Sequence, residues 1–224
     1  SGAAFRGPLV SVPRATFGHM KLMELDDSEI GEAMEVRLSH SRDPGGAWWP
    51  GYEEWRATGT LILSEEIELD VVTIDMLRTP LSDPELALDL DGMDADLGNI
   101  GAVVLDEETG EPSVAVDELV GIGGHMLIVR RVTCDPRLEG RHIGRWVVAE
   151  AIQAMKPGIE FVAVIAAPLD HSKGAGWEEI CQKLREVWAS IGFIYMEEHV
   201  MVLNPDLSEP VERMKDLRER FGVR

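Results

Sequence analysis

The chain has 224 residues, 45% of them hydrophobic, and a formal net charge of -20 at pH 7. The hydrophobic share is enough for a sizeable core, whereas the negative charge argues against a general nucleic-acid surface and against binding to anionic membranes. No apolar run approaches the roughly 20 residues that cross a bilayer, and no secretory signal pattern opens the chain, so we expect a soluble cytoplasmic protein. The two cysteines, Cys134 and Cys181, are far apart in sequence, which predicts reduced thiols rather than a disulfide or a metal site.

The N-terminal part combines an unpatterned start, one helix and an aromatic-rich loop. Residues 1–20 have little periodicity, and we interpret them as a flexible or vector-derived arm before a single domain over residues 21–224. Residues 27–39 predict a helix capped by Asp or Ser. Residues 41–55 indicate a loop, whose three tryptophans either pack over the core or wall a substrate pocket.

The middle of the chain predicts β-structure followed by helix. Residues 57–64 and 67–78 are two β-rich runs separated by a short acidic turn, so they predict a hairpin or meander. Residues 82–105 predict helix in at least their second half, because the apolar residues from Leu97 to Val104 have the spacing of one helical face.

The C-terminal half alternates strands and helices most clearly. Its β-α-β-α-β order predicts an α/β fold with at least one parallel pair of strands. The predicted strands are residues 124–134, 159–167 and 193–203, and the predicted helices are residues 140–155, 176–193 and 209–222. The residues expected to face inward are Ile143, Val147, Ala151 and Met155 in the first helix and Ile180, Leu184, Val187 and Ile191 in the second.

The loop between the first of these strands and its helix carries the strongest sign of a ligand. Arg137, Arg141 and Arg145 surround Gly140 and Gly144. A helix N-terminus exposes unpaired N–H groups and a partial positive charge, and glycines let a ligand approach the main chain. Such a loop can bind a diphosphate, although many loops of this kind only reverse the chain.

The succession of elements over residues 124–203 resembles the C-terminal core of the GNAT N-acetyltransferase superfamily. In that family a strand ending in V-x-P precedes the loop [Q/R]-x-x-G-x-[G/A], and an aromatic-x-x-x-G-F segment follows later. The N-terminal half, over residues 58–105, resembles the family more loosely.

The motif residues of the family map onto particular positions. Pro136 takes the place of the proline, and Glu139 that of the Gln or Arg. His142 takes the place of the first glycine and Gly144 that of the second. Trp188 leads the segment "WASIGF". The acyl-CoA loop is therefore degenerate at its first and fourth positions.

The resemblance implies a fold and a co-substrate. The fold would be a mixed central sheet flanked by helices, with splayed central strands and an elaborated N-terminal half. The co-substrate would be acetyl-CoA, and no metal is implied. The resemblance places its pantetheine arm against Val132, Thr133 and Cys134. It places the diphosphate on Glu139, Gly140, Arg141, His142, Ile143, Gly144 and Arg145.

The resemblance also implies an acyl-CoA-dependent N-acyltransferase in which a small amine attacks the thioester directly. The family's usual acid is a tyrosine at the place of Trp188, and tryptophan cannot supply that proton. Tyr195 is the substitute candidate, or else a strand residue packed on the core. His125 is the candidate base, or else a structural histidine at a strand edge. Asp170 and His171 are candidates to border the acceptor site.

Two other functions remain open. One is a catalytically silent GNAT-like domain with a binding or regulatory role, and the other is an unrelated α/β binding protein. For an enzyme, the acidic charge favours a cationic small-molecule amine as partner, with no nucleic acid and no membrane. A homodimer is a further expectation, because dimers are frequent in the superfamily that the chain resembles. Cys134 is expected to be a small buried residue rather than a nucleophile.

Overall fold

The computed structural model describes residues 24–41, 51–64, 66–119, 124–168, 174 and 176–222. The expected arm at residues 1–20 lies outside these ranges, as do Trp48 and Trp49 and the acceptor-site candidates Asp170 and His171.

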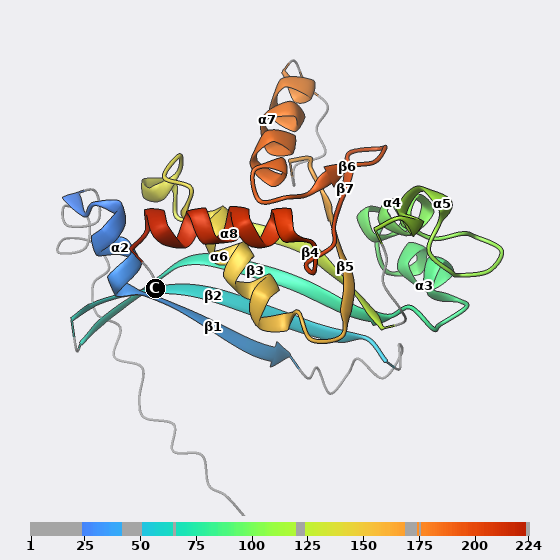
Figure 1. Ribbon diagram of the computed structural model, residues 1–224, viewed down its shortest axis with the longest axis horizontal. Helices are drawn as coiled ribbons and strands as arrows, with labels where there is room; N and C mark the ends of the chain where they lie inside the picture. The colour runs from blue at the N-terminus through green and yellow to red at the C-terminus, as the bar shows by residue number, and fades with distance from the viewer. Residues whose placement is uncertain are drawn as a thin grey trace, which may run out of the picture.

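The described residues form a seven-stranded mixed sheet in the order β1-β2-β3-β4-β5-β7-β6, with helices on both faces (Figure 1). The α/β class expected from the sequence is confirmed. The strands are β1 (Met34–Ser41), β2 (Glu53–Ser64), β3 (Ile67–Pro80), β4 (His125–Cys134), β5 (Ile159–Ile165), β6 (Ile194–Tyr195) and β7 (Val200–Leu203). The helices are α2 (Asp27–Ala33), α3 (Leu86–Met93), α4 (Ala95–Val104), α5 (Val114–Asp117), α6 (Ile143–Met155), α7 (Trp177–Ala189) and α8 (Ser208–Arg220), with a 3-10 turn η1 at Pro136–Leu138.

The sheet joins an antiparallel meander to a parallel crossover. Strands β1 to β4 pair antiparallel in sequence order, and β5 pairs antiparallel with β7. Between them, β4 and β5 are parallel and are connected through α6. A parallel pair requires such a crossover, because a tight turn can only join antiparallel strands.

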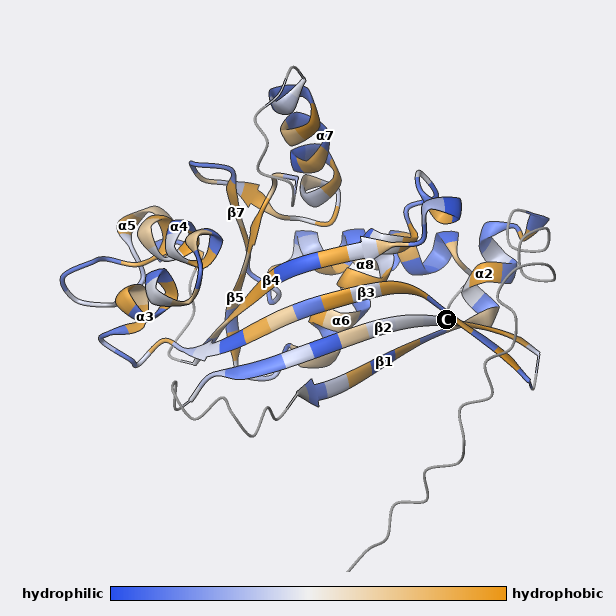
Figure 2. Ribbon diagram, turned by 180° about the vertical axis from the view of Figure 1, so that it is seen from behind, coloured by the Kyte–Doolittle hydropathy of each residue, from blue (hydrophilic) through white to orange (hydrophobic). Residues whose placement is uncertain are grey.

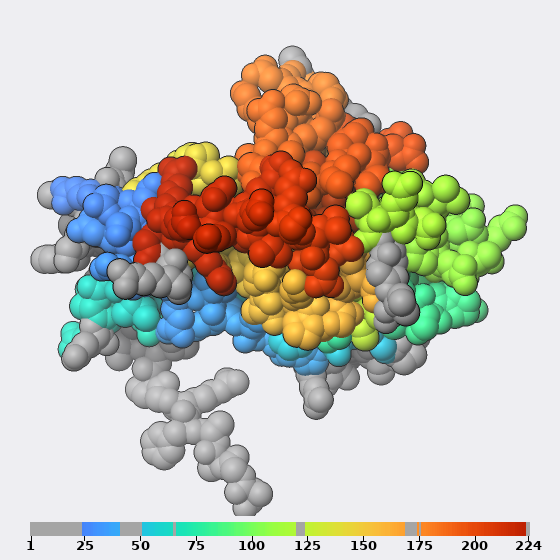
Figure 3. All heavy atoms as spheres, in the orientation of Figure 1, coloured from blue at the N-terminus to red at the C-terminus, as the bar shows by residue number. Residues whose placement is uncertain are grey.

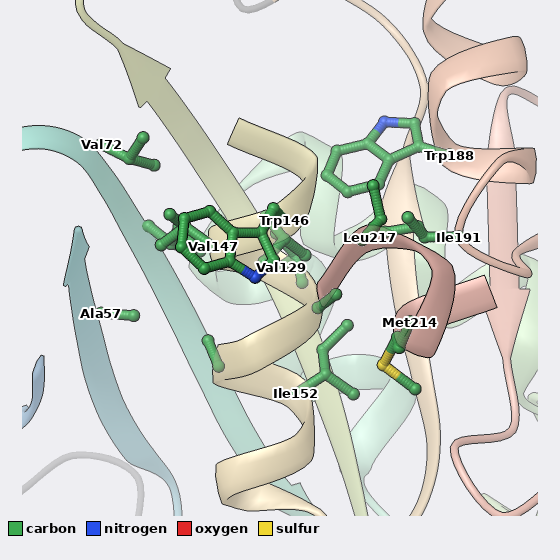
Figure 4. Packing of buried hydrophobic residues seen from close by; sticks show 14 of the residues in the cluster. Ala57, Val72, Val129, Trp146, Val147, Ile152, Trp188, Ile191, Met214 and Leu217 are labelled. Carbon is green, nitrogen blue, oxygen red and sulfur yellow. The ribbon is translucent and has the colours of Figure 1, made fainter. Parts of the chain in front are cut away.

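Two hydrophobic cores lie on opposite faces of the sheet. On one face α6 packs on the strands and α8 packs on α6; Figure 4 shows Trp146 and Ile152 of α6 beside Met214 and Leu217 of α8. The inward stripe expected on α6 is confirmed, because all of its residues are at most 8% exposed. On the other face α3, α4 and α5 cover one end of the sheet.

Two expected elements change type along their length. The helix expected over residues 27–39 ends at Ala33 and continues as β1, whose residues alternate polar and apolar side chains as a strand does. A capping box at Asp26 and Glu29 begins the helix, so the expected Asp cap is present. The strand expected over residues 193–203 is a hairpin of β6 and β7.

The expectation for α7 is wrong for two of the four residues expected to face inward. Ile180 is 47% exposed and Val187 is 39% exposed, whereas Ile191, just beyond the helix, is buried. The N-terminal part of α7 projects from the body of the molecule (Figures 1 and 3). Leu184, which is half-buried, and Trp188 pack on the core, and Trp188 contacts Phe193 edge-on.

The contact of α2 with α8 depends on a glycine. A Cβ on Gly31 would overlap the carbonyl oxygen of Phe221, the residue that follows α8. We predict that Gly31→Ala lowers the free energy of unfolding by at least about 2 kcal/mol, because the backbone at the end of α8 must shift. In the control variant Gly101→Ala the new Cβ meets its nearest atoms at 3.5 to 3.6 Å. That variant should raise the free energy of unfolding by about 0.5 kcal/mol, because alanine favours a helix interior. Urea denaturation measures both, and equal effects would contradict this packing of α2.

Candidate functional site

The two parallel strands separate halfway along β4. They pair from His125 as far as the pair of Val129 with Val164. Beyond that pair β4 stays beside β3 and β5 stays beside β7, so the strands diverge (Figure 2). On the β5 side, residues 130–134 of β4 therefore have no strand partner within the described part of the chain. An open strand edge presents N–H and C=O groups that can pair with an extended ligand.

A β-bulge lies at the point of separation. Asp75 of β3 pairs with Arg131, and the next residue, Met76, pairs with Val129. Arg130 is therefore the extra residue of β4. A bulge of this kind changes the direction of a strand and re-aims its side chains, and it occurs often beside active sites.

The loop after β4 directs the start of α6 toward this open edge. Gly140 and His142 both adopt positive φ angles, of 76° and 67°. The main-chain N–H groups of Gly140, His142 and Ile143 have no hydrogen-bond acceptor among the described residues. A Cβ on Gly140 would meet no atom within 4 Å, so the main chain is accessible there. Together these features form a site for an anion at a helix N-terminus.

His142 has the backbone conformation of a glycine. A left-handed conformation costs a non-glycine residue roughly 1–2 kcal/mol. His142 is the position at which the sequence resemblance expected the first glycine of the loop, and a glycine would adopt this conformation without strain. Burial lowers the pKa of His142, and the charges of Arg145 and Arg220 lower it further. The imidazole is therefore neutral at pH 7.

Arg145 is a cation without a carboxylate partner within the described part of the chain. Its Nη1 donates to Ser190 Oγ at 2.8 Å, and its Nε is buried with no partner there. Burial lowers the pKa of Arg145, and the charge of Arg220 adds to the effect. A bound phosphate would satisfy both the buried Nε and the positive charge.

The other two loop arginines are already paired. Arg141 and Arg220 both bind the carboxylate of Asp27, at 3.0 and 2.9 Å. Burial alone would raise the pKa of Asp27, but the hydrogen bonds from Arg220 and Arg141 outweigh it and hold the pKa below its usual value. Arg137 donates two hydrogen bonds to the carboxylate of Asp135 in the same turn, so its guanidinium is already occupied.

Cys134 lies beneath the first turn of α6. Its side chain is half-buried. Burial raises the pKa of the Cys134 thiol, the charges of Asp135 and Glu139 add to this, and the nearby main-chain N–H groups of Asp135 and Gly144 offset only part of the rise. The side chain therefore stays protonated, which suits a packing role better than that of a nucleophile.

A pocket of about 750 Å³ opens on the other face of the sheet. It extends from the point of separation across β1 to β4 to the start of α4. Figure 2 colours the polar residues of these strands blue. Four carboxylates and three arginines line it. These residues are Glu54, Asp75, Asp94, Asp96, Arg56, Arg130 and Arg131.

Ion pairs connect several of these side chains. Arg130 binds Asp94 at 2.9 Å and Glu54 at 3.3 Å, which links the sheet to α4. Arg56 binds Asp75 at 2.7 Å. Sequence reasoning sought a base on β4 alone and missed these carboxylates, although Asp75 alternates with apolar residues along β3 and so had to face the side opposite Ile74 and Met76.

The structure does not bring the two expected catalytic residues to the point of separation. His125 is at the other end of β4, roughly 13 Å from Val129 at about 3.3 Å per residue. Its Nδ1 lies 3.3 Å from an Nη atom of Arg78, which suits the structural interpretation. Tyr195 is on the edge strand β6 and is 45% exposed, with the guanidinium of Arg185 5.0 Å from its ring centroid. Its role as an acid stays a prediction.

The described ranges contain neither a metal site nor a membrane-spanning helix. No group of three or more His, Cys, Asp or Glu side chains there could hold a metal ion. No described helix is long and apolar enough to cross a membrane.

Comparison with known proteins finds similarity only among solved structures. No protein-family model matches the chain, and no curated protein matches it. AtaT complexed with acetyl-methionyl-tRNAfMet is 13% identical over 69% of this chain and 71% of that chain, with a TM-score of 0.38. The KacTA–DNA complex is 10% identical over 84% and 99%, with a TM-score of 0.38. AtaTR bound with acetyl-CoA is 11% identical over 82% and 98%, with a TM-score of 0.37. At these values the similarity concerns the fold alone.

The expectation that nucleic acid is no partner is corrected by these comparisons. Two of the similar structures contain DNA or tRNA. Net charge is a sum over the whole chain, and it does not describe a local surface. Arginines still gather locally in this acidic protein, at the start of α6 and in the pocket.

His142 should make stability depend on pH. Because the folded state lowers its pKa below the ordinary 6.5, the unfolded chain binds the proton more readily. The free energy of unfolding should therefore fall as the pH drops below 6.5 toward the folded-state pKa. We predict a smaller loss between pH 7.5 and pH 5.5 in His142→Gly and His142→Gln. At pH 7.5 the glycine variant should also be more stable by about 0.5–1 kcal/mol, because its backbone strain is relieved. Urea denaturation at both pH values tests this, and an unchanged pH dependence in both variants would assign the titration to another group.

Proposed function

We propose that the chain is an acyl-CoA-dependent N-acyltransferase that uses acetyl-CoA and acts on a small amine. The observation that carries this proposal is the separation of β4 from β5 after Val129, with the N-terminus of α6 beside the opening. Acyl-CoA has a flexible arm attached to a diphosphate, so it matches both the separated strands and the helix N-terminus. The open edge of β4 suits an amide-containing arm, and the unpaired N–H groups of α6 suit the diphosphate.

The donor would be held by main-chain groups and one free cation. Residues 132–134 would pair with the pantetheine arm, while residues 140–143 would donate N–H groups to the diphosphate. Arg145 would supply the positive charge that its described surroundings leave without a partner. Arg141 would join it once Asp27 releases that guanidinium.

The acceptor would enter from the opposite face through the pocket. The pocket reaches Val129, Arg130 and Ile165, which lie at the separation of the strands. A thioester passing between the strands would therefore meet an amine approaching from that pocket. This arrangement keeps the two substrates on opposite faces, so the reacting atoms meet only at the gap.

The chemistry would need a base and a group that stabilises negative charge. A bound acyl-CoA supplies the electrophilic carbonyl. Asp75 faces the pocket one strand away from the bulge, so it would take a proton from the acceptor's ammonium, directly or through water. The neutral amine would then attack the thioester carbonyl, the C–S bond would break, and the released thiolate would take up the proton that the new amide nitrogen loses. A main-chain N–H group at the bulge would donate a hydrogen bond to the developing oxyanion.

A catalytically silent domain is the second candidate function. Two observations favour it: Asp27 occupies Arg141 and Arg220, and Trp188 is buried at the place of the family's usual acid. A silent domain would bind CoA or a partner without transferring an acyl group.

Binding of CoA is the first test of the proposed function. CoA and acetyl-CoA should raise the melting temperature, because a ligand that binds only the folded state stabilises it. Arg145→Gln should weaken that binding about tenfold, because a charge-assisted hydrogen bond is lost. Lys215→Gln, which removes an exposed cation of α8, is the control and should bind as the wild type does. Calorimetry at constant ionic strength measures both variants. An absence of binding at millimolar CoA would refute the proposal, and binding without thiol release across an amine panel would favour the silent domain.

A second test concerns the base. Asp75→Asn should lower kcat about a hundredfold and change KM by less than about threefold, because proton removal is lost while the pocket is kept. Glu54→Gln removes another carboxylate of the same pocket and should have a much smaller effect on kcat. Equal losses in the two variants would mean that Asp75 acts only through the charge of the pocket.

A further inference from the structure

We infer that the acceptor is a zwitterion, with a carboxylate or phosphate group close to its amine, and that Arg131 binds this anionic group. The inference rests on the proposed function, because it assigns the substrate class of the same pocket. It replaces the purely cationic acceptor that the net charge of the chain suggested.

The bulge of β4 provides the geometric basis. Along a regular strand, neighbouring side chains point to opposite faces of the sheet. The extra residue in β4 breaks this alternation, because Arg130 binds Asp94 at the start of α4 while the next residue, Arg131, pairs directly with Asp75, whose side chain faces the same pocket. Arg130 and Arg131 therefore present two adjacent guanidinium groups on one face.

The three arginines of the pocket differ in their partners. Arg130 is held between Glu54 and Asp94, and Arg56 is held by Asp75. Arg131 has neither an ion pair nor a hydrogen bond from its side chain to any residue that the structure describes. It is therefore the arginine of the pocket that can bind a ligand anion without breaking an existing ion pair.

The position of Arg131 sets the distance between the two charges of the ligand. Arg131 and Asp75 are directly opposite each other on neighbouring strands. The Cβ atoms of such pairs lie about 4.5–5.5 Å apart. An ammonium at Asp75 and an anion at Arg131 would thus be separated by only a few bonds, as in an amino acid or a short aminoalkyl phosphate.

The charges that face each other favour the same class of ligand. Asp75 attracts an ammonium directly across the strand pair from Arg131. A polyamine would place its second positive charge close to Arg131, where the two would repel each other. A zwitterion would place its ammonium beside Asp75 and its anionic group on the unpaired guanidinium of Arg131.

Matched pairs of amines test the inference. Tyrosine is compared with tyramine, and phosphoethanolamine with ethanolamine, in a thiol-release assay with acetyl-CoA. Binding of the same four compounds is measured without acetyl-CoA by saturation-transfer NMR. The proteins are the wild type, Arg131→Gln, and the control Arg37→Gln, which removes an ion-paired arginine of β1 outside the pocket.

In at least one pair, the member that carries the carboxylate or phosphate should have a kcat/KM and an affinity about tenfold higher in the wild type. Arg131→Gln should remove this preference while leaving the amine that lacks the anionic group unaffected, and Arg37→Gln should keep it. The pair with the larger preference identifies the anion as a carboxylate or a phosphate.

Failure of the inference differs from failure of the proposed function. If the two members of each pair bind equally, with and without the anionic group, or if Arg131→Gln keeps the preference, the inference is overturned even when tyramine is acetylated. If no amine releases thiol, the proposed activity fails. The binding measurements then still decide whether the pocket selects zwitterions through Arg131.

Discussion

The chain of hydrogen bonds between β4 and β5 ends after Val129, and the rest of the site depends on that end. Up to that residue the two strands are central members of one sheet, with a core on each face. Beyond it each strand stays with its outer neighbour, and the edge of β4 is free. Main-chain N–H and C=O groups in the middle of a sheet need hydrogen-bond partners, which here must be water or a ligand. The opening can therefore bind an extended ligand.

Each face of the sheet contributes something different to this opening. On the face of α6, unpaired N–H groups and Arg145 make a site for an anion, while Asp27 neutralises neighbouring arginines. On the face of α4, ion pairs such as Arg130 with Asp94 connect the sheet to the helices that cover it. The bulge at Arg130 links the two faces, because it lies at the separation and also determines which side chains enter the pocket.

Local sequence patterns predicted most of the C-terminal half correctly. The stripe of α6 is apolar at helical spacing, and every residue of it is buried. The same reasoning failed for α7, whose apolar residues Ile180 and Val187 also have helical spacing. Periodicity shows which residues share a face, but it does not show whether another element covers that face. Only the tertiary structure shows that α7 projects from the body and leaves Ile180 and Val187 exposed.

Part of the candidate site was predictable, because that part is a single contiguous stretch of sequence. The loop from Glu139 to Arg145 is contiguous, so its glycines and arginines indicate an anion site from local sequence alone. The sequence by itself also determined the α/β class, through the alternation of strands and helices. Asp75, Asp94 and Arg131 come from β3, the N-cap of α4 and β4, and no local pattern relates them. Strand pairing, the bulge and the placement of α4 brought them into one pocket, because side chains distant in sequence become neighbours only through the register and packing of whole elements.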